Sequence, residues 1–193
     1  MEWCIPIQTL QVDNVQLGNT PVGPKPMISL SYRDTDLHFS CLTLLLPKLT
    51  IKSYTPSSGR LIMSLDESIQ TVSKLTALQD ILLSAVYNNQ QRWFPRNTSL
   101  RKMSEIKDTF QSIIHDTDMN LYCPINENDE QGPNVYRDGV WSRGILQSGI
   151  LSPGSSIRIV VKLQGLSFHV YPSSDQWSGK FRLQHRILAV LIS

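Results

Sequence analysis

The sequence predicts a mainly β protein, an elaborated antiparallel barrel with two mid-chain helices, folded as a single domain over residues 1–193. Three observations predict this fold class. Apolar and polar residues alternate in the C-terminal third, as in strands buried on one face. Short alternating segments separated by turn residues occupy the first third. Between them, apolar residues recur at steps of three and four, the spacing of a helix packed on one side.

The C-terminal third has the pattern of a wide hairpin. Strands are expected at Ser156–Tyr171 and Lys180–Ile192, with turn residues between them. In the first of these strands, apolar residues occupy odd positions up to Leu163 and even positions from Leu166 onward. Because a shift of one residue exchanges the two faces of a strand, we expect a bulge or sharp bend at Gly165.

The first third predicts a meander of short strands. Residues 1–26 contain four prolines and are expected to form an extended N-terminal arm, with one strand within Gln8–Leu17 and a loop at Gly18–Pro26. Turn chemistry then separates four alternating segments: Met27–Tyr32, Leu37–Leu46, Leu49–Tyr54 and Arg60–Leu65.

Two helices are expected in the middle of the chain. The first runs from Ser68 to about Asn89, and the second from Ser99 to His115, each with one apolar stripe. Both stripes predict core packing, since their spacing is that of a helix lying on a sheet. The pair Trp93–Phe94 follows the first helix and is expected to anchor that helix to the sheet.

Charge is distributed unevenly, although the net charge is only +2. Residues 108–130 hold six acids and no Lys or Arg, whereas residues 131–193 hold seven basic residues and two acids. Residues 116–134 predict an acidic surface excursion around one short strand, Leu121–Cys123. Its acids are candidates for covering the basic C-terminal region. A further short strand or turn is expected at Val135–Trp141.

Several classes of protein are excluded by missing features. The three cysteines are widely spaced, which argues against a disulfide framework or a structural zinc site and favours a reducing, intracellular compartment. No apolar run approaches the ~18 residues of a membrane span, so no membrane partner is expected. Phosphate-binding, dinucleotide-binding and hydrolase motifs are missing. We therefore expect no enzymatic activity, no metal and no cofactor.

Cations and aromatic rings are interleaved in the C-terminal third, and strand alternation places five of the cations on one outward surface. Binding of single-stranded nucleic acid needs cations beside the phosphates and exposed rings on which bases stack, at ~1–3 kcal/mol per base. Trp177, in a Ser/Gly/Asp-rich turn, is expected to be the main stacking ring and Trp141 the second. The candidate nucleic-acid-binding residues are Arg137, Trp141, Arg143, Arg158, Lys162, Trp177, Lys180, Arg182 and Arg186.

A family resemblance supports the same function. The chain contains, in order, a Pro-rich stretch, a Leu-rich helix at Lys74–Leu83, the Trp93–Phe94 pair and a closing hairpin with Ile157–Leu166 and Trp177–Gln184. This order resembles the OB-fold single-stranded DNA-binding proteins of large eukaryotic DNA viruses and related mobile elements.

The resemblance covers about two-thirds of the chain as a pattern. It implies an OB-like barrel that coats single strands without sequence preference, in replication or recombination, in the host nucleus or at a viral replication site. It also implies contacts at Lys162, Trp177 and Arg182. RNA as the ligand and a homo-oligomeric state stay open.

Two alternative functions compete with this one. A structural or assembly protein would use the basic face to dock an acidic protein partner, with Trp177 as an apolar anchor. A phosphoesterase would use the triplets His38–Ser40 and His115–Thr117, which resemble the paired motif of the two-histidine phosphoesterases. The two imidazoles would then serve as acid and base on a phosphodiester.

Overall fold

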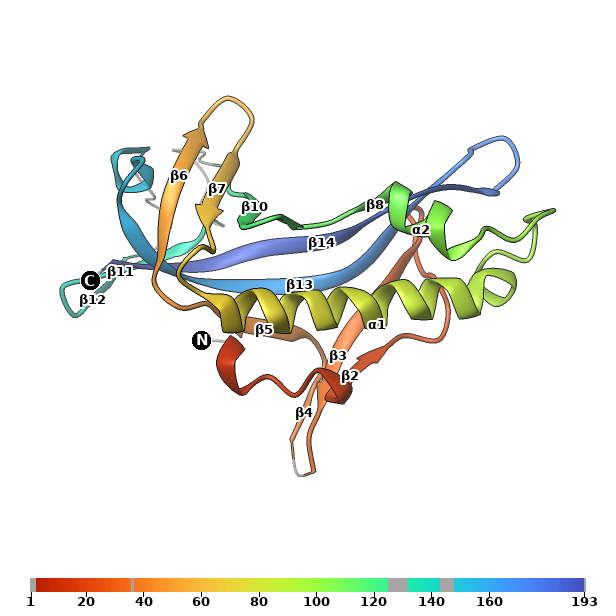
Figure 1. Cartoon of the computed structure of the whole chain (residues 1–193), viewed down its shortest axis with the longest axis horizontal. Coiled ribbons are helices and arrows are strands. Elements are labelled where there is room, and N and C mark those ends of the chain that lie inside the picture. Colours follow the sequence, from red (N-terminus) through yellow and green to blue (C-terminus); the bar gives the residue numbers. More distant parts are fainter. Residues whose placement is uncertain (1–2, 36, 125–131, 143–147, 193) are drawn as a thin grey trace.

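Two long strands, β13 (Ser156–Val170) and β14 (Trp177–Ile192), form a curved hairpin that extends across the computed structural model (Figure 1). The structure describes residues 3–35, 37–124, 132–142 and 148–192. The two strands pair antiparallel from Arg158 opposite Leu191 to Val170 opposite Trp177. The predicted hairpin is therefore confirmed, although its second strand begins at Trp177 rather than at Lys180.

The predicted irregularity at Gly165 is also confirmed. Leu163 lies opposite His185 and Gly165 lies opposite Gln184, so β13 carries one extra residue at this point. Gly165 has a φ of 149°, and a Cβ there would lie 2.1 Å from the carbonyl oxygen of Ile28. Only glycine fits this close approach. The bulge returns the apolar residues that follow it to the same buried face.

The other strands attach to the two sides of this hairpin. On its free side, β13 pairs in succession with β6 (Leu49–Thr55), β5 (Leu42–Leu45) and β3 (Met27–Arg33). On its own free side, β14 pairs with β11 (Asn134–Arg137) and β8 (Phe110–Gln111). The remaining strands are β1 (Ile5–Pro6), β2 (Val15–Leu17), β4 (His38–Phe39), β7 (Arg60–Ser64), β9 (Ile114–His115), β10 (Asp118–Tyr122) and β12 (Val140–Ser142).

The fold class agrees with the prediction, since the protein is mainly β with two mid-chain helices. Within the described residues, the main strand path runs from β12 through β14, β13 and β6 to β9 without returning to its start. The sheet is therefore barrel-like in its curvature but not closed. Most pairs are antiparallel, and the pairs β1–β5, β11–β14 and β8–β14 are parallel.

The long helix α1 (Ile69–Trp93) extends along the hairpin in Figure 1. It confirms the first predicted helix and is longer than predicted by about one turn at its C-terminal end. Trp93 and Phe94 are buried at this end, and their rings contact Phe168, with centroids 5.9 Å and 5.0 Å away. The pair therefore anchors the helix to the sheet, as predicted.

The second helix, α2 (Met103–Thr109), is shorter than the predicted Ser99–His115. Phe110 leaves the helix and pairs with Phe181 as part of β8, and the two rings stack with centroids 4.9 Å apart. Ile114 then joins β9. The apolar residues of Ser99–His115 have helical spacing, but pairing with the sheet ends the helix at Thr109.

The N-terminal segment is part of the core rather than an extended arm. Ile7 and Leu10 are fully buried, and short helical turns occupy Ile7–Thr9 and Val12–Asn14. The strand expected within Gln8–Leu17 is limited to β2, which pairs with β3. The loop Gly18–Pro26 is tied to the body at both ends: the Trp93 indole N–H donates a 3.1 Å hydrogen bond to the carbonyl of Asn19, and Phe168 N–H donates a 2.9 Å hydrogen bond to the carbonyl of Pro26.

The buried apolar residues belong to one cluster that includes strands from both halves of the chain. Cys4, Cys41 and Cys123 are free thiols. Neither described helix combines the length and apolarity that crossing a bilayer requires.

Candidate functional site

The five cations predicted to share a surface do lie on one face of the β13–β14 ladder. Residues opposite one another in an antiparallel pair point to the same side. Lys162 lies opposite Arg186, and Ser167 lies opposite Arg182. Arg158 lies an even number of residues from Lys162 on β13, and Lys180 lies an even number from Arg182 on β14. Each of these pairs therefore points to the same side of its strand. The opposite face carries Phe168, which packs against Trp93 at the end of α1, and Phe181, which stacks on Phe168.

Most of these cations are accessible. Arg158, Lys180, Arg182 and Arg186 are exposed, and Lys162 is half-buried. Within residues 3–35, 37–124, 132–142 and 148–192, no carboxylate lies within ion-pair distance of Arg158, Lys180 or Arg182. From Arg158 to His169, β13 has a contour length of about 35 Å at the usual rise per strand residue.

A cleft of about 480 Å³ lies on this face at the turn end of the hairpin. Its floor is a row of paired residues that crosses three strands, from Ser167 on β13 through Arg182 on β14 to Gln111 on β8. Its walls come from the loop that precedes β3 and from the hairpin turn. The residues lining it are Pro24, Lys25, Pro26, Gln111, Ser167, Phe168, His169, Val170, Pro172, Asp175, Lys180, Phe181 and Arg182.

The prediction that Trp177 is an exposed stacking ring is wrong. Only 2% of Trp177 is exposed. Its ring stacks on Phe94 with centroids 5.1 Å apart, and its indole N–H donates a 3.1 Å hydrogen bond to the carbonyl of Lys180. Arg101 lies over the same ring, 5.5 Å from its centroid. Trp177 therefore belongs to the core beneath the basic face, because the end of α1 covers it.

Two further predicted residues, Arg137 and Trp141, lie at the other end of the hairpin. Trp141 on β12 is 43% exposed, and its ring lies 5.0 Å from that of Tyr136 on the paired strand β11. The pairing continues from Tyr136 to Leu191 and then to Arg158, so these residues share one face. Arg137 is exposed and forms a 3.5 Å ion pair with Asp138. Arg143 lies outside the described residues.

Three residues near the cleft are not among the candidate nucleic-acid-binding residues, although Tyr171 belongs to the interleaved cations and rings of the C-terminal third. Lys25 lines the cleft from the proline-rich loop, far from the basic block in the sequence. His169 also lines it, and the ring of Tyr171, which is 49% exposed, lies 6.1 Å from the His169 ring. The parity after Gly165 could have found these two rings, because Ser167, His169 and Tyr171 alternate with the buried Phe168.

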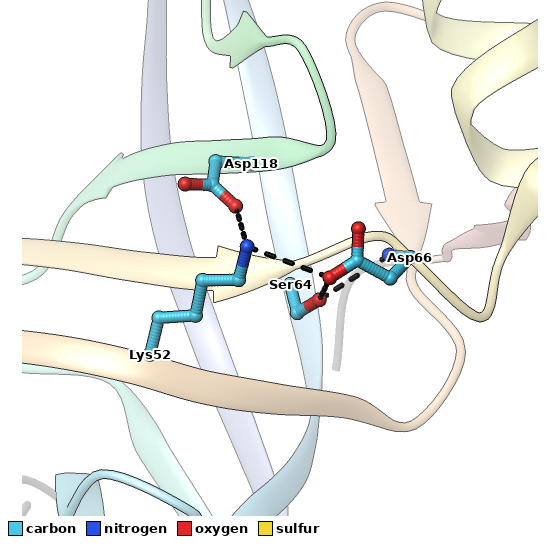
Figure 2. Close-up of polar contacts among 4 residues, drawn as sticks. All are labelled: Lys52, Ser64, Asp66 and Asp118. Carbon is cyan, nitrogen blue, oxygen red and sulfur yellow. Dashed lines mark hydrogen bonds and ion pairs between the residues drawn. The ribbon is translucent and has the colours of Figure 1, made fainter.

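One acid of the predicted acidic excursion, Asp118, belongs to an ion-pair network with Lys52 and Asp66. Figure 2 shows the ammonium group of Lys52 between the carboxylates of Asp118 on β10 and Asp66. Hydrogen bonding to Asp118 raises the pKa of Lys52. Hydrogen bonds from Thr117 and Ser64 lower the pKa of Asp66. These two carboxylates are thus held by their own partners. Residues 125–131, which include Glu127, Asp129 and Glu130 of the excursion, lie outside the described residues.

The histidines do not form a site of their own among the described residues. His38 lies on β4, which pairs with β3, and His115 lies on β9, which pairs with β10, so the two phosphoesterase triplets occupy different branches of the sheet. His169 and His185 lie on opposite faces of the hairpin. His185 accepts a 2.8 Å hydrogen bond from the backbone N–H of Tyr122. Across the described ranges, no group of three or more His, Cys, Asp or Glu residues is arranged to hold a metal ion.

No protein-family model, curated protein or solved structure matches the chain.

Proposed function

We propose that this chain binds single-stranded DNA without sequence preference, through the outward face of the β13–β14 hairpin. One observation carries the proposal: Lys25, Arg158, Lys180 and Arg182 have no carboxylate partner among residues 3–35, 37–124, 132–142 and 148–192, and three of the four line a cleft on that face. Unpaired cations along a surface attract the phosphates of a nucleic acid strand. The resemblance to the viral OB-fold family supports a role in replication or recombination.

Stacking would come from exposed rings at the two ends of the hairpin. Tyr171 and His169 lie beside the cleft, and Trp141 with Tyr136 lies at the end near Arg158. Each base stacked on an aromatic ring contributes ~1–3 kcal/mol, and such stacking is tolerant of sequence. These rings thus take the stacking role that the sequence predicted for Trp177.

Salt dependence tests the proposal. If the strand contacts the four unpaired cations, the slope of log K against log salt should be about −3, since each phosphate contact contributes about −0.7 for single strands. Fluorescence anisotropy with labelled oligothymidine at several salt concentrations measures it. Arg158→Ala and Lys180→Ala should each reduce the slope by about 0.7. Binding that is insensitive to salt would contradict the proposal.

A matched control separates phosphate binding at the basic face from non-specific electrostatic binding elsewhere on the protein. Arg92 is an exposed cation on α1, outside the hairpin. Arg92→Ala should leave the affinity and the slope unchanged, because it removes the same charge from a different surface. A polyglutamate competitor distinguishes the alternative in which the basic face docks an acidic protein. Displacement of oligothymidine by polyglutamate at equal charge concentration would favour that alternative.

A further inference from the structure

We infer that the cleft at the hairpin turn holds one whole nucleotide of the bound strand, phosphate and base together. The rest of the face contacts the strand only through its phosphates and through bases stacked on exposed rings. The inference deepens the proposed function and rests on it. Its starting point is size. A volume of about 480 Å³ falls in the range of ligand pockets, ~300–1,000 Å³, and is larger than one phosphate group requires.

The phosphate would bind at the cationic side of the cleft. Lys25, Lys180 and Arg182 line it from two segments that are far apart in the sequence. None of the three is neutralised by a carboxylate of the described chain. Among the described residues that line the cleft, Asp175 is the one acid, and it is paired with Arg96. A group with one or two negative charges is thus the ligand that this side of the cleft favours.

The base would bind between the apolar and ring-bearing walls. Pro24 and Pro172 face the cleft from the two loops, and His169 supplies an aromatic ring. Gln111 and Ser167 on its floor carry amide and hydroxyl groups that can both donate and accept hydrogen bonds. Flat apolar surfaces with a few polar groups are typical of small-molecule sites. Their acceptor oxygens match the N–H donors of a nucleobase edge, whereas a fully ionised phosphate has no donor to offer them.

The floor of the cleft is rigid, which favours a preformed site. Directly beneath it, the rings of Phe110, Phe181 and Phe168 stack in a row, with centroid distances of 4.9 Å and 5.6 Å. Trp177 packs against the same row from below. The proline-rich wall is fastened by the hydrogen bond from Phe168 N–H to Pro26. A preformed site loses little entropy when its ligand binds.

Isothermal titration calorimetry with deoxythymidine monophosphate, thymidine and inorganic phosphate tests this inference. The monophosphate should bind at least tenfold more tightly than either of the other two, because only it fills both sides of the cleft. Lys25→Ala should weaken monophosphate binding at least fivefold. Lys25 is exposed in a loop, so the variant should fold, as circular dichroism will verify. Equal binding of phosphate and monophosphate would overturn the inference.

Arg158→Ala is the matched control. It removes one unpaired cation from the same face but outside the cleft, so monophosphate affinity should stay within twofold while oligothymidine affinity falls. An equal loss for both ligands would overturn the inference of a separate subsite. If the protein bound oligothymidine but not the monophosphate, only the subsite would be refuted. Monophosphate binding without any oligothymidine binding would instead refute the proposed function.

Discussion

Truncating Trp177 to alanine should reduce stability severely, although the sequence suggested a surface role for this residue. A tryptophan buries about 200 Å², which at 25 cal/mol per Å² corresponds to about 5 kcal/mol. The unfolded chain already buries part of that area, which reduces the contribution to about 3–4.5 kcal/mol. Losing the hydrogen bond to the Lys180 carbonyl adds about 1 kcal/mol. We expect a loss of about 4–5.5 kcal/mol in the free energy of unfolding.

Urea unfolding followed by far-ultraviolet circular dichroism measures this loss without using the tryptophan as a reporter. Trp141→Ala is the matched control, because Trp141 is 43% exposed on an edge strand, and its removal should cost less than about 1 kcal/mol. Since folded proteins have only about 5–15 kcal/mol of stability, Trp177→Ala should lie close to its unfolding transition. If Trp177→Ala lost less than about 1.5 kcal/mol but bound oligothymidine more weakly, its burial in the core would be refuted.

Three further predictions concern other parts of the fold. Gly165→Ala should lower the free energy of unfolding by about 3 kcal/mol or more, because the new Cβ would lie 2.1 Å from the Ile28 carbonyl oxygen; a wild-type urea midpoint would contradict the bulge. Burial lowers the pKa of folded His185, so the unfolded chain binds the extra proton and stability should fall as the pH drops below about 6.5. His185→Gln should flatten this decline in urea titrations, and an unaltered decline would assign it to other groups. Burial raises the pKa of the Cys123 thiol to about 12, so mass spectrometry should find it unmodified by iodoacetamide in the folded protein and alkylated in denaturant. Rapid labelling without denaturant would disprove that burial.

Strand parity carried most of the correct sequence predictions. The shift of the apolar positions from odd to even around Gly165 predicts the bulge, and with it the common face of Lys162 and Arg182. This inference works because side chains alternate strictly along a strand, so a break in the pattern has few physical explanations. The same rule, extended past Phe168, would also have placed His169 and Tyr171 outward.

The failures arose where distant segments decide the environment. Trp177 follows turn residues, and nothing near it in the sequence indicates that Phe94, at the end of a helix, will cover it. Phe110 has helical spacing, but its pairing with Phe181 draws it into the sheet. Lys25 is a single cation in a proline-rich loop and carries no pattern. Only the folded arrangement brings it to Lys180 and Arg182.

The order in which the other strands pair with β13 affects how the protein folds during its synthesis. Strands β6, β5 and β3 precede β13 in the chain and pair with it in turn, so each emerges from the ribosome with one edge still open. Open strand edges invite association between nascent chains. Contacts between segments so distant in sequence also form slowly. Chaperones that shield those edges during translation should therefore raise the yield of native protein, until the last hairpin arrives and covers them.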